Sequence, residues 1–594
     1  MISRRNYLSI TIMMGIIFFL FLFSGAAKSA LSHYEVNEYA WEDGTPKGWK
    51  ADAGATTETH GVLLYLGAND SMLKLCQRYC MLRQYTCLDS IEASVGKELQ
   101  LVVVDGVSMS EETWKQVQAY HEAGIPIVFG SLPSSRRIGR DIELAGMLGI
   151  TNIQASEVEL SGMTLYENFL VGDKVIYQAK TKEEQKQQDL NLSVPWYVLN
   201  SGTKVYMDGL LPDTYDELDA AYKPPVVWRY RNDKGCVFAV NSDFFTSDIG
   251  LGMLCAMESE LSEQFVYPII NAQNLVALNY PTFMEENTDT LRKLYSRDVT
   301  AVLRDLVWPG IVAVSEHNHG YPSVCMSPKL DYGVNNWVDG ERVAYYLQLL
   351  REQHGEAGIN LCAWAGATTE EKLAYDKTFF DTYAKEYAFQ FAYAKDLTPK
   401  EAKESLDTAG FSRVRALLCD YSEDLPLVDV AEGMLLMQVT NEGSSHTYRE
   451  DLRMRSIQTI LGYSVIGQDF SQIVYPWGKS DQWEKVFDRF SSYTNTYWRD
   501  YHFYEETTIS QAAGRTNRFL QLSYEVTYGD KDITITSDAS AEAPVYFVVK
   551  SDTAIRDVEG GSFQPMDANR WLITATDATV RIAWDSDADL MFWR

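Results

Sequence analysis

Two neighbouring histidines and two more distant groups are the residues of this chain best suited to catalysis. Glu316, His317 and His319 stand together in the run Glu-His-Asn-His, which places two imidazoles and a carboxylate on one short loop. Asp331 and His446 each follow a predicted strand. A trio of imidazoles can hold zinc or another divalent metal and lower the pKa of a bound water to about 7. Asp331 would then act as the base, and His446 as a ligand or an acid.

The same residues also allow a plainer interpretation. A His-x-His pair in a hairpin loop is common at polar surfaces, and His446, which follows two serines, could simply cap the next helix. Trp477 is close in sequence to Tyr475, Trp483 and Trp498, and these rings could line a sugar cleft by stacking. They could equally belong to a core, since the spacing of several neighbouring aromatic residues fits a buried helix face.

The overall charge narrows the choice of partners. Acidic side chains outnumber basic ones by 82 to 52, which gives a net charge of −30 and argues against nucleic-acid binding. A cationic partner, such as a polymer of free amino sugars, would be attracted. The acidic excess is also compatible with a solvated surface on an exported protein.

The first residues predict where the protein works. Arg4 and Arg5 precede an uncharged, apolar run from Tyr7 to Ala27, long enough as a helix to span roughly 30 Å of bilayer. We interpret residues 1–30 as a signal anchor that leaves the bulk of the chain outside the cytoplasm at the cell membrane. A cleaved secretory signal is the alternative, because small residues close the run.

Three of the eight cysteines are clustered. Cys76, Cys80 and Cys87 lack the spacing of a zinc site or a redox motif, and Cys76 and Cys80 share one face of a predicted helix. Outside the cytoplasm some cysteines could pair, whereas buried free thiols are the alternative. The connectivity stays open at this stage.

The order of elements predicts several domains. Residues 31–58 are polar and are interpreted as a tether. In residues 59–262, apolar strands at 61–67, 99–104 and 125–129 alternate with helical segments, which predicts a parallel sheet of the flavodoxin or glutamine-amidotransferase type. No cysteine nucleophile and no GxGxxG loop follows these strands, so we interpret this domain as non-catalytic.

Repeated strand–helix units in residues 263–518 predict a (β/α) barrel, whose active site would lie at the carboxyl ends of its strands. Predicted strands at 310–316 and 321–326 flank the loop that carries both histidines, and a strand at 434–439 leads to His446. On this basis the four candidate catalytic groups would converge.

The last part of the chain has a different pattern. Residues 519–594 contain short alternating runs separated by Gly and Asp, which predicts an antiparallel β-sandwich. The fold class expected from the sequence is therefore multidomain α/β with an N-terminal transmembrane helix and a C-terminal sandwich.

Three local patterns and the domain order carry a resemblance to a known family. The patterns are Tyr-Pro-Ile-Ile-Asn at 267–271, Val-Cys-Met-Ser-Pro-Lys-Leu-Asp-Tyr-Gly at 324–333, and Glu-Thr-Thr-Ile-Ser at 506–510 with Arg515 and Arg518 beyond it. From about residue 60 to 594 the chain resembles the bacterial DUF2194 family. It also resembles the flavodoxin-like, deacetylase-like and β-sandwich portions of PelA of Pel exopolysaccharide systems.

The resemblance implies a NodB-like polysaccharide-deacetylase barrel with an altered site. Active members carry a strand that ends in Thr-Phe-Asp-Asp-Gly, in which the first aspartate is the base and the second binds metal, and a later His-x3-His. Here Asp331 falls on the base, Tyr332 replaces the metal-binding aspartate, and residues 386–393 contain no histidine. The inherited site would therefore lack metal ligands, and we expect no cofactor.

Three functions follow as hypotheses. The first is a membrane-anchored extracytoplasmic protein of a Pel-like pathway whose barrel binds polysaccharide, or synthase and export proteins, without turnover; Glu316 and Trp477 are its candidate binding residues. The second is an active carbohydrate esterase that holds zinc or another divalent metal through His317 and His319, with Asp331 and His446 as catalytic groups. The third is a purely structural scaffold.

Overall fold

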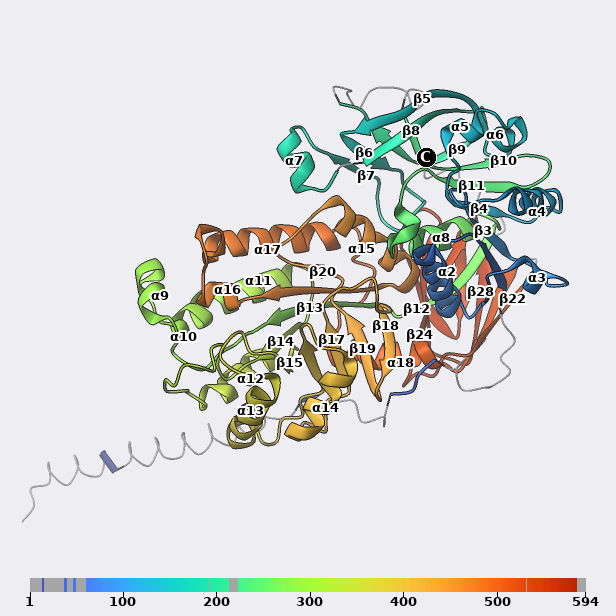
Figure 1. The fold of residues 1–594 in the computed structure, drawn as a ribbon. Helices are drawn as coiled ribbons and strands as arrows, with labels where there is room; N and C mark the ends of the chain where they lie inside the picture. Colours follow the sequence, from blue (N-terminus) through green and yellow to red (C-terminus); the bar gives the residue numbers. More distant parts are fainter. Residues whose placement is uncertain are drawn as a thin grey trace, which may run out of the picture.

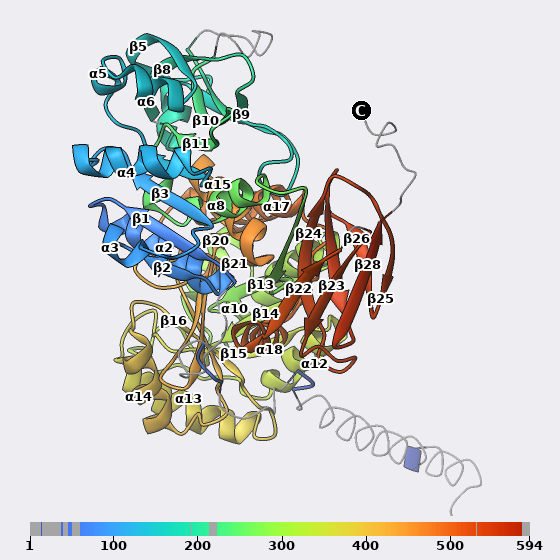
Figure 2. The same cartoon turned by 90° about the vertical axis from the view of Figure 1, so that its right-hand side faces the viewer.

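The computed structural model of this chain describes residues 13–14, 37–39, 46–49, 60–190, 192–212, 223–529 and 531–584. They form an α/β domain at the top of Figure 1, a half-barrel at its lower left, and two antiparallel sheets that Figure 2 shows at the right. The predicted anchor, residues 1–30, falls almost wholly outside the described residues. Among the helices that are described, none has the length and hydropathy needed to cross a membrane.

The first domain is built around strands that are apolar along their length. Its elements are β1 (Val62–Leu66), α2 (Asp70–Arg83), β2 (Thr86–Leu88), α3 (Ile91–Ser94), β3 (Leu101–Asp105), α4 (Glu111–Glu122), β4 (Ile127–Ser131), α5 (Ser135–Ile138), α6 (Ile142–Met147), β5 (Ile150–Leu160), β6 (Gly162–Leu165), β7 (Val175–Gln178), α7 (Lys182–Gln187), β8 (Leu192–Leu199), β9 (Lys204–Leu210), β10 (Pro225–Arg231), β11 (Cys236–Val240), η3 (Phe244–Thr246) and α8 (Ile249–Ser259). Buried side chains of α2 and α8 cover one face of the sheet, and those of α4, α5 and α6 cover the other. The parallel strands that the sequence predicts are confirmed. β10 and β11 form an antiparallel hairpin late in the domain.

The sheet has the order β2-β1-β3-β4-β11-β10-β9-β6-β7. Its first five strands in this order are parallel, and the rest are added antiparallel. β5 and β8 form a separate ribbon. The sequence pattern predicts no elements between 150 and 210. β5, for example, is mostly exposed and has no buried face to impose a hydrophobic period.

The half-barrel supplies the candidate site. Its elements are β13 (Ala272–Leu278), α9 (Thr288–Tyr295), α10 (Val299–Val302), η4 (Leu303–Val307), α11 (Trp308–His317), β14 (Pro322–Met326), α12 (Arg342–Glu352), β15 (Glu356–Asn360), α13 (Thr369–Tyr383), β16 (Phe391–Ala394), α14 (Pro399–Ala409), β17 (Ala416–Cys419), β18 (Val428–Ala431), β19 (Met434–Gln438), β20 (Asn441–Glu442), α15 (Tyr448–Leu461), β21 (Tyr463–Asp469), α16 (Ser471–Val474), η5 (Lys479–Asp481), α17 (Trp483–Trp498) and α18 (Ile509–Gln521). The sheet order is β18-β19-β17-β16-β15-β14-β13-β21-β20.

One chain segment runs from β19, next to one edge of this sheet, to β20 at the other edge. β19 pairs in parallel with β17, and β20, which follows directly, pairs in parallel with β21. Between them the N–H of Val439 donates to the carbonyl of Cys419, and that of Thr440 to the carbonyl of Val465. The parallel strands therefore curve around a common axis, and their carboxyl ends meet at one end, which we call the mouth.

The strand predicted at 310–316 is wrong, because this segment belongs to helix α11. Trp308, Ile311 and Val314 are buried at intervals of three residues, which places them on one helix face. The short apolar run fits a strand as well as a helix, and only packing against α17 and β14 decides between them.

The C-terminal part consists of two antiparallel sheets that share one hydrophobic core. Their strands are β12 (Gln264–Ile269), β24 (Val545–Ser551), β27 (Arg570–Ala575) and β26 (Gly561–Pro565) in one sheet, and β22 (Tyr524–Tyr528), β23 (Asp532–Ser537), β28 (Thr579–Trp584) and β25 (Ile555–Glu559) in the other. β12 contains the segment that the sequence assigned to the start of the barrel. It pairs with β24 instead, and the half-barrel begins at β13.

The three parts pack as one body. A single hydrophobic core includes Leu63 of the first domain, Val276 of the half-barrel and Val548 of the C-terminal sheets. α8 and α15 approach closely at Gly252, whose N–H donates to Ser456 Oγ at 2.7 Å. A Cβ at position 252 would lie 2.3 Å from the carbonyl oxygen of Ser456, so only glycine allows this approach.

Two described stretches of the predicted tether contact this body. The Nδ2 of Asn37 donates to the carbonyl of Ala388 at 2.9 Å. The buried ring of Trp49 packs edge-on against Phe519 of α18, with 6.0 Å between ring centroids. These stretches are therefore parts of the folded structure.

Candidate functional site

Polar side chains connect three strand ends at the mouth. Asn279 follows β13 in the left-handed conformation, with φ 54°, which asparagine tolerates better than most residues. Its Nδ2 donates to Asp469 Oδ1, at the end of β21, over 3.0 Å. Its Oδ1 accepts a hydrogen bond from Nδ2 of Asn360, at the end of β15. The resulting chain of hydrogen bonds fixes the inner rim of the mouth.

Carboxylates gather on the next strands. The hydroxyl of Tyr393, in β16, donates to Asp420 Oδ1 at 2.5 Å, directly after β17. Burial and the charges of Asp420 and Glu450 raise the pKa of Glu442, whereas the charge of Lys395 opposes this shift. The mouth is therefore acidic along this side.

A second group of residues lies where the loops after β13, β14, β15 and β21 meet. The carboxylate of Glu286 is almost fully buried and accepts the N–H groups of Leu330 at 2.8 Å and Asp331 at 3.1 Å. It also accepts the hydroxyl of Tyr475 at 2.6 Å. The ring of Trp364 stacks on Tyr475, with centroids 4.1 Å apart and planes 11° apart. We call Glu286, Asp331, Trp364 and Tyr475 the Asp331 cluster.

The electrostatics of this cluster follow from its burial. Burial raises the pKa of Glu286, although hydrogen bonds from Tyr475 and two backbone N–H groups oppose the shift, and the charge of Asp331 adds to it. Asp331 itself is half-buried, and its Oδ1 accepts the N–H of Gly333 at 2.8 Å. The cluster thus combines a shielded carboxyl group with a more accessible one.

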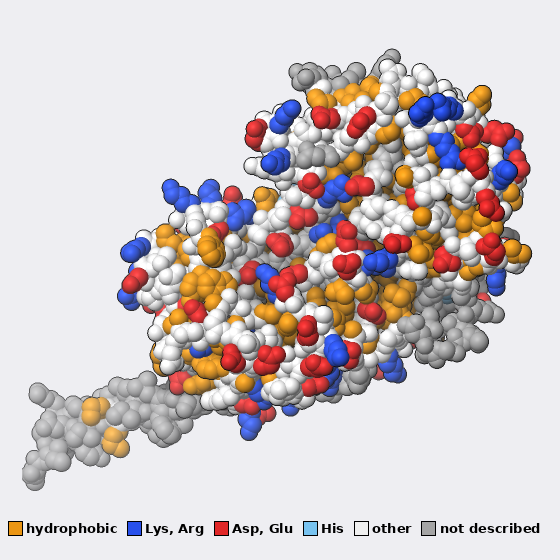
Figure 3. All heavy atoms as spheres, in the orientation of Figure 1, with side chains coloured by type: hydrophobic (Ala, Val, Ile, Leu, Met, Phe, Trp, Pro, Cys, Tyr) orange, Lys and Arg blue, Asp and Glu red, His pale blue; other side chains and the backbone are white. Residues whose placement is uncertain are grey.

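Large exposed rings surround the same end of the half-barrel. Trp337, Trp364 and Trp477 lie in the loops after β14, β15 and β21 and are 70%, 38% and 91% exposed. Figure 3 shows hydrophobic side chains gathered around α16, beside acidic ones. By contrast, Trp483 and Trp498 are buried and belong to the core. Exposed rings of this kind offer flat faces on which sugar rings can stack.

The predicted metal pair lies at the other end of the strands. α11 ends at His317, and His319 precedes β14, whereas Asp331 follows this strand. The five residues of β14 separate the two positions by about 16 Å. Glu316 and both histidines are exposed. The predicted convergence of these groups depended on the strand at 310–316, and the helix found there removes its basis.

The described residues do not form a zinc site. Catalytic zinc takes three protein ligands and an open position. In the described ranges, no group of three or more His, Cys, Asp or Glu side chains could hold a metal ion. We therefore derive no hydrolytic step through a metal.

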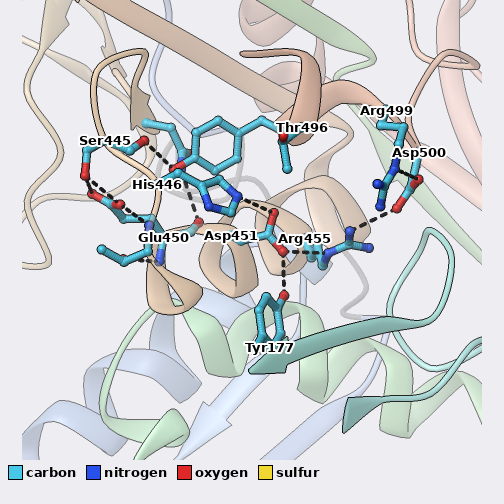
Figure 4. A network of polar contacts seen from close by, with 12 residues as sticks. Tyr177, Ser445, His446, Glu450, Asp451, Arg455, Thr496, Arg499 and Asp500 are labelled. Carbon is cyan, nitrogen blue, oxygen red and sulfur yellow. Dashed lines mark hydrogen bonds and ion pairs between the residues drawn. The ribbon is translucent and has the colours of Figure 1, made fainter. Parts of the chain in front are cut away.

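His446 takes part in a network between the half-barrel and the first domain (Figure 4). Its Nε2 lies 3.6 Å from Asp451 Oδ1, and its ring packs against Tyr497 with centroids 4.8 Å apart. Asp451 also accepts the hydroxyl of Tyr177 from β7 and Nε of Arg455 at 2.9 Å. Burial opposes ionisation of Asp451, but the Arg455 charge and the hydrogen bonds hold its pKa well below the usual range. This arrangement suits a structural ion pair.

Sequence reasoning missed Glu286, Trp364, Asn279 and Asp420 as site residues. Asn279, Asp420 and Trp364 follow the end of a barrel strand by at most four residues, and that position was the signal available. Glu286 lies deeper in the loop after β13, where the signal is weaker. The signal was not used for Asn279, because the start of the barrel was placed one strand too early.

Comparison with known proteins supports the fold. No family model and no curated protein matches the sequence. Among solved structures, the chain is similar to Agd3, described as a novel carbohydrate deacetylase, with a TM-score of 0.51 and 10% identity. The match covers 89% of this chain and 99% of Agd3. The chain shares its fold with a carbohydrate deacetylase.

A second solved structure, the exo-beta-1,4-mannosidase Op5Man5 from Opitutaceae bacterium strain TAV5, matches with a TM-score of 0.20 and 14% identity. It covers 34% of this chain and 33% of the mannosidase. A similarity at this level carries no argument. The likeness to Agd3 therefore stands as the support for a deacetylase-like architecture, and membership of the DUF2194 family stays a prediction.

Proposed function

We propose that this protein binds a polysaccharide chain at the mouth of its deacetylase-like half-barrel, without turnover. The observation that carries the proposal is the stack of Trp364 on Tyr475 next to Asp331, which pairs with Ala365 in an isolated bridge. A sugar ring can lie on the exposed indole while its hydroxyl or amino hydrogens donate to the carboxylate. The net charge of −30 favours polymers that carry free amino groups.

The test is calorimetric titration with amino-sugar oligomers, acetylated and deacetylated. Trp364→Ala should lower the affinity by about 2- to 10-fold, the range expected for one stacked ring. Phe563→Ala is the matched control, because this ring is 39% exposed and lies in β26, away from the mouth. Equal affinities of Trp364→Ala and the parent chain would contradict the proposal.

An active deacetylase is the second candidate, favoured by the likeness to Agd3 and by the carboxylates at the mouth. Release of acetate from an acetylated oligomer would support it, provided that Asp331→Asn abolishes the release while the oligomer still binds. Binding without acetate release, with and without added divalent metal, supports the non-catalytic proposal.

The proposed location is the cell membrane, with the bulk of the chain outside the cytoplasm and with exopolysaccharide synthase or export proteins as partners. Only residues 31–36 separate the proposed anchor from Asn37, a distance of about 20 Å when extended. Asn37 contacts Ala388, which precedes β16, and Glu38 pairs with Arg351, which precedes β15. Both contacts therefore lie at the amino-terminal end of the strands. An anchor in this position would turn the mouth away from the membrane, toward polymer.

A further inference from the structure

Two thiols face each other at the edge of the first domain. Cys80 is buried in the last turn of α2, and Cys87 is half-buried in the middle of β2. α2 packs against β2, and Cys87 lies against the same hydrophobic core that contains Cys80. The pKa of each thiol is shifted mainly by the other thiol, which is consistent with a contact between the two sulfurs. Cys76, one turn earlier on the same face of α2, is fully buried. The cysteine cluster seen in the sequence thus contains one pair in contact.

A tight turn holds this pair in place. Gln84 caps α2 in the left-handed conformation, with φ 57° and ψ 40°. The N–H of Tyr85 then donates to the carbonyl of Cys80 at 2.7 Å, which reverses the chain. β2 is fixed in turn by parallel pairing with β1, where Cys87 lies opposite Leu63. Both cysteines therefore stand on backbone that hydrogen bonds already restrain.

The surroundings give the two thiols different roles. The hydrogen bond from Cys80 lowers the pKa of Cys87, while burial acts against this shift. The same hydrogen bond, together with burial, raises the pKa of Cys80. Cys87 is half-buried whereas Cys80 is buried, so Cys87 is the thiol that a reagent can reach first.

We propose that Cys80 and Cys87 form a disulfide bond when the chain is exposed to the oxidising environment outside the cytoplasm. The oxidant is a disulfide of a protein thiol oxidase or of a small thiol. The Cys87 thiolate attacks one of its sulfurs and releases a first thiolate, which leaves Cys87 in a mixed disulfide. Cys80 then loses its proton, and its sulfur attacks the Cys87 sulfur and displaces the oxidant's second thiolate. One S–S bond forms in the protein, and the oxidant leaves as two thiols that carry the two electrons and two protons.

The disulfide bond would stabilise the contact between the first domain and the C-terminal sheets. Gln84, inside the closed loop, donates through Nε2 to the carbonyl of Leu522 at 2.9 Å. The guanidinium of Arg83 lies 4.8 Å from the ring centroid of Phe265, in β12. A covalent loop over 80–87 limits how far α2 can separate from the edge strand β2 and from these partners. The inference rests on the proposed export but not on sugar binding.

The test uses the full chain, trapped by alkylation in cells and isolated from the membrane fraction. Peptide mass spectrometry should find Cys80 joined to Cys87, lighter by two hydrogens than the two thiol peptides, with Cys76 alkylated only after denaturation. In a second arm, the purified, reduced full chain is treated with oxidised glutathione. This second arm tests only whether Cys80 and Cys87 lie close enough to form the bond, independently of where the chain is located in the cell.

Two variants complete the experiment. Cys87→Ser should lower the melting temperature by about 2–4 °C without reductant and should leave it unchanged with reductant. Cys236→Ser is the matched control, because this buried thiol lies in β11 and has no thiol partner at the 80–87 turn. Its effect should be the same with and without reductant.

Native chains with both thiols free, or with Cys76 joined to either partner, would overturn the proposal. The glutathione arm then shows the reason: failure to form the bond there rejects the geometry, and formation there rejects the export on which the inference rests. Loss of sugar binding in either arm has no bearing on the result.

Discussion

The two ends of the half-barrel differ in what their polar groups do. At the mouth, carboxylates and exposed rings lie in loops that leave Asp331 accessible and Trp477 91% exposed. At the amino-terminal end, α18 and the stretch 37–39 close the strands off. There Glu356, which begins β15, is fully buried and accepts the N–H of Ser510 in the first turn of α18 at 2.6 Å.

Two buried glutamates, one at each end of the half-barrel, have different structural roles. Burial raises the pKa of Glu286 at the mouth and that of Glu356 at the closed end. Glu286 holds loops that carry exposed site residues, whereas Glu356 holds a helix terminus inside the protein. The same chemical group therefore supports binding at one end and packing at the other, and position along the strand decides which.

The largest expected effect is on the free energy of unfolding, and it comes from Glu356 at the closed, amino-terminal end of the strands. Burial raises the pKa of Glu356 from 4.5 to about 7 in the folded chain. Below about pH 4.5 the group is protonated in both states; between 4.5 and 7 the unfolded chain releases a proton that the folded chain retains. The free energy of unfolding therefore falls as pH rises, by about 3 kcal/mol at pH 8.

Glu356→Gln removes this titration and keeps an oxygen acceptor for the N–H of Ser510. Its stability relative to the parent chain should rise between pH 4.5 and 8, as measured by urea unfolding. Glu370→Gln, at an exposed position of α13, is the control and should follow the parent chain. If the unfolding free energies of Glu356→Gln and the parent chain changed with pH in the same way, the raised pKa of Glu356 would be contradicted.

An intermediate effect is expected at the mouth. Glu286→Ala leaves two backbone N–H groups and the Tyr475 hydroxyl without their acceptor, which should cost about 1–3 kcal/mol of unfolding free energy and weaken oligomer binding. Glu286→Gln retains an acceptor oxygen and should recover most of both losses. Wild-type binding by the alanine variant would mean that Glu286 does not position the site.

The smallest effect is expected for the predicted metal pair. The double variant His317→Ala and His319→Ala changes exposed residues at the end opposite Asp331, so its stability should stay within about 0.5 kcal/mol of the parent chain. Oligomer affinity should also be unchanged in titration calorimetry. A large loss of oligomer affinity in this double variant would contradict the conclusion that only the mouth binds the oligomer.

Much of the fold could be predicted from the sequence because its strands are strongly apolar. β3 and β4 appear as continuous hydrophobic runs, and the strands predicted at 99–104 and 125–129 lie within two residues of those found, Leu101–Asp105 and Ile127–Ser131. The helix α11 was predicted to be a strand, since a run of six apolar or small residues fits both the period of a helix and that of a strand. The error moved two histidines from one end of a strand to the other, and the candidate metal site depended on it.

The sequence by itself determined the alternation of strands and helices, the acidic character and the presence of three close cysteines, because these depend on residue types and local spacing. Only the tertiary structure decided that Trp364 meets Tyr475, that β12 joins the C-terminal sheets, and that Cys80 contacts Cys87. Such contacts join loops that follow different strands, or a helix and a strand across a turn. Their geometry depends on sheet order and chain reversal, which no local period encodes.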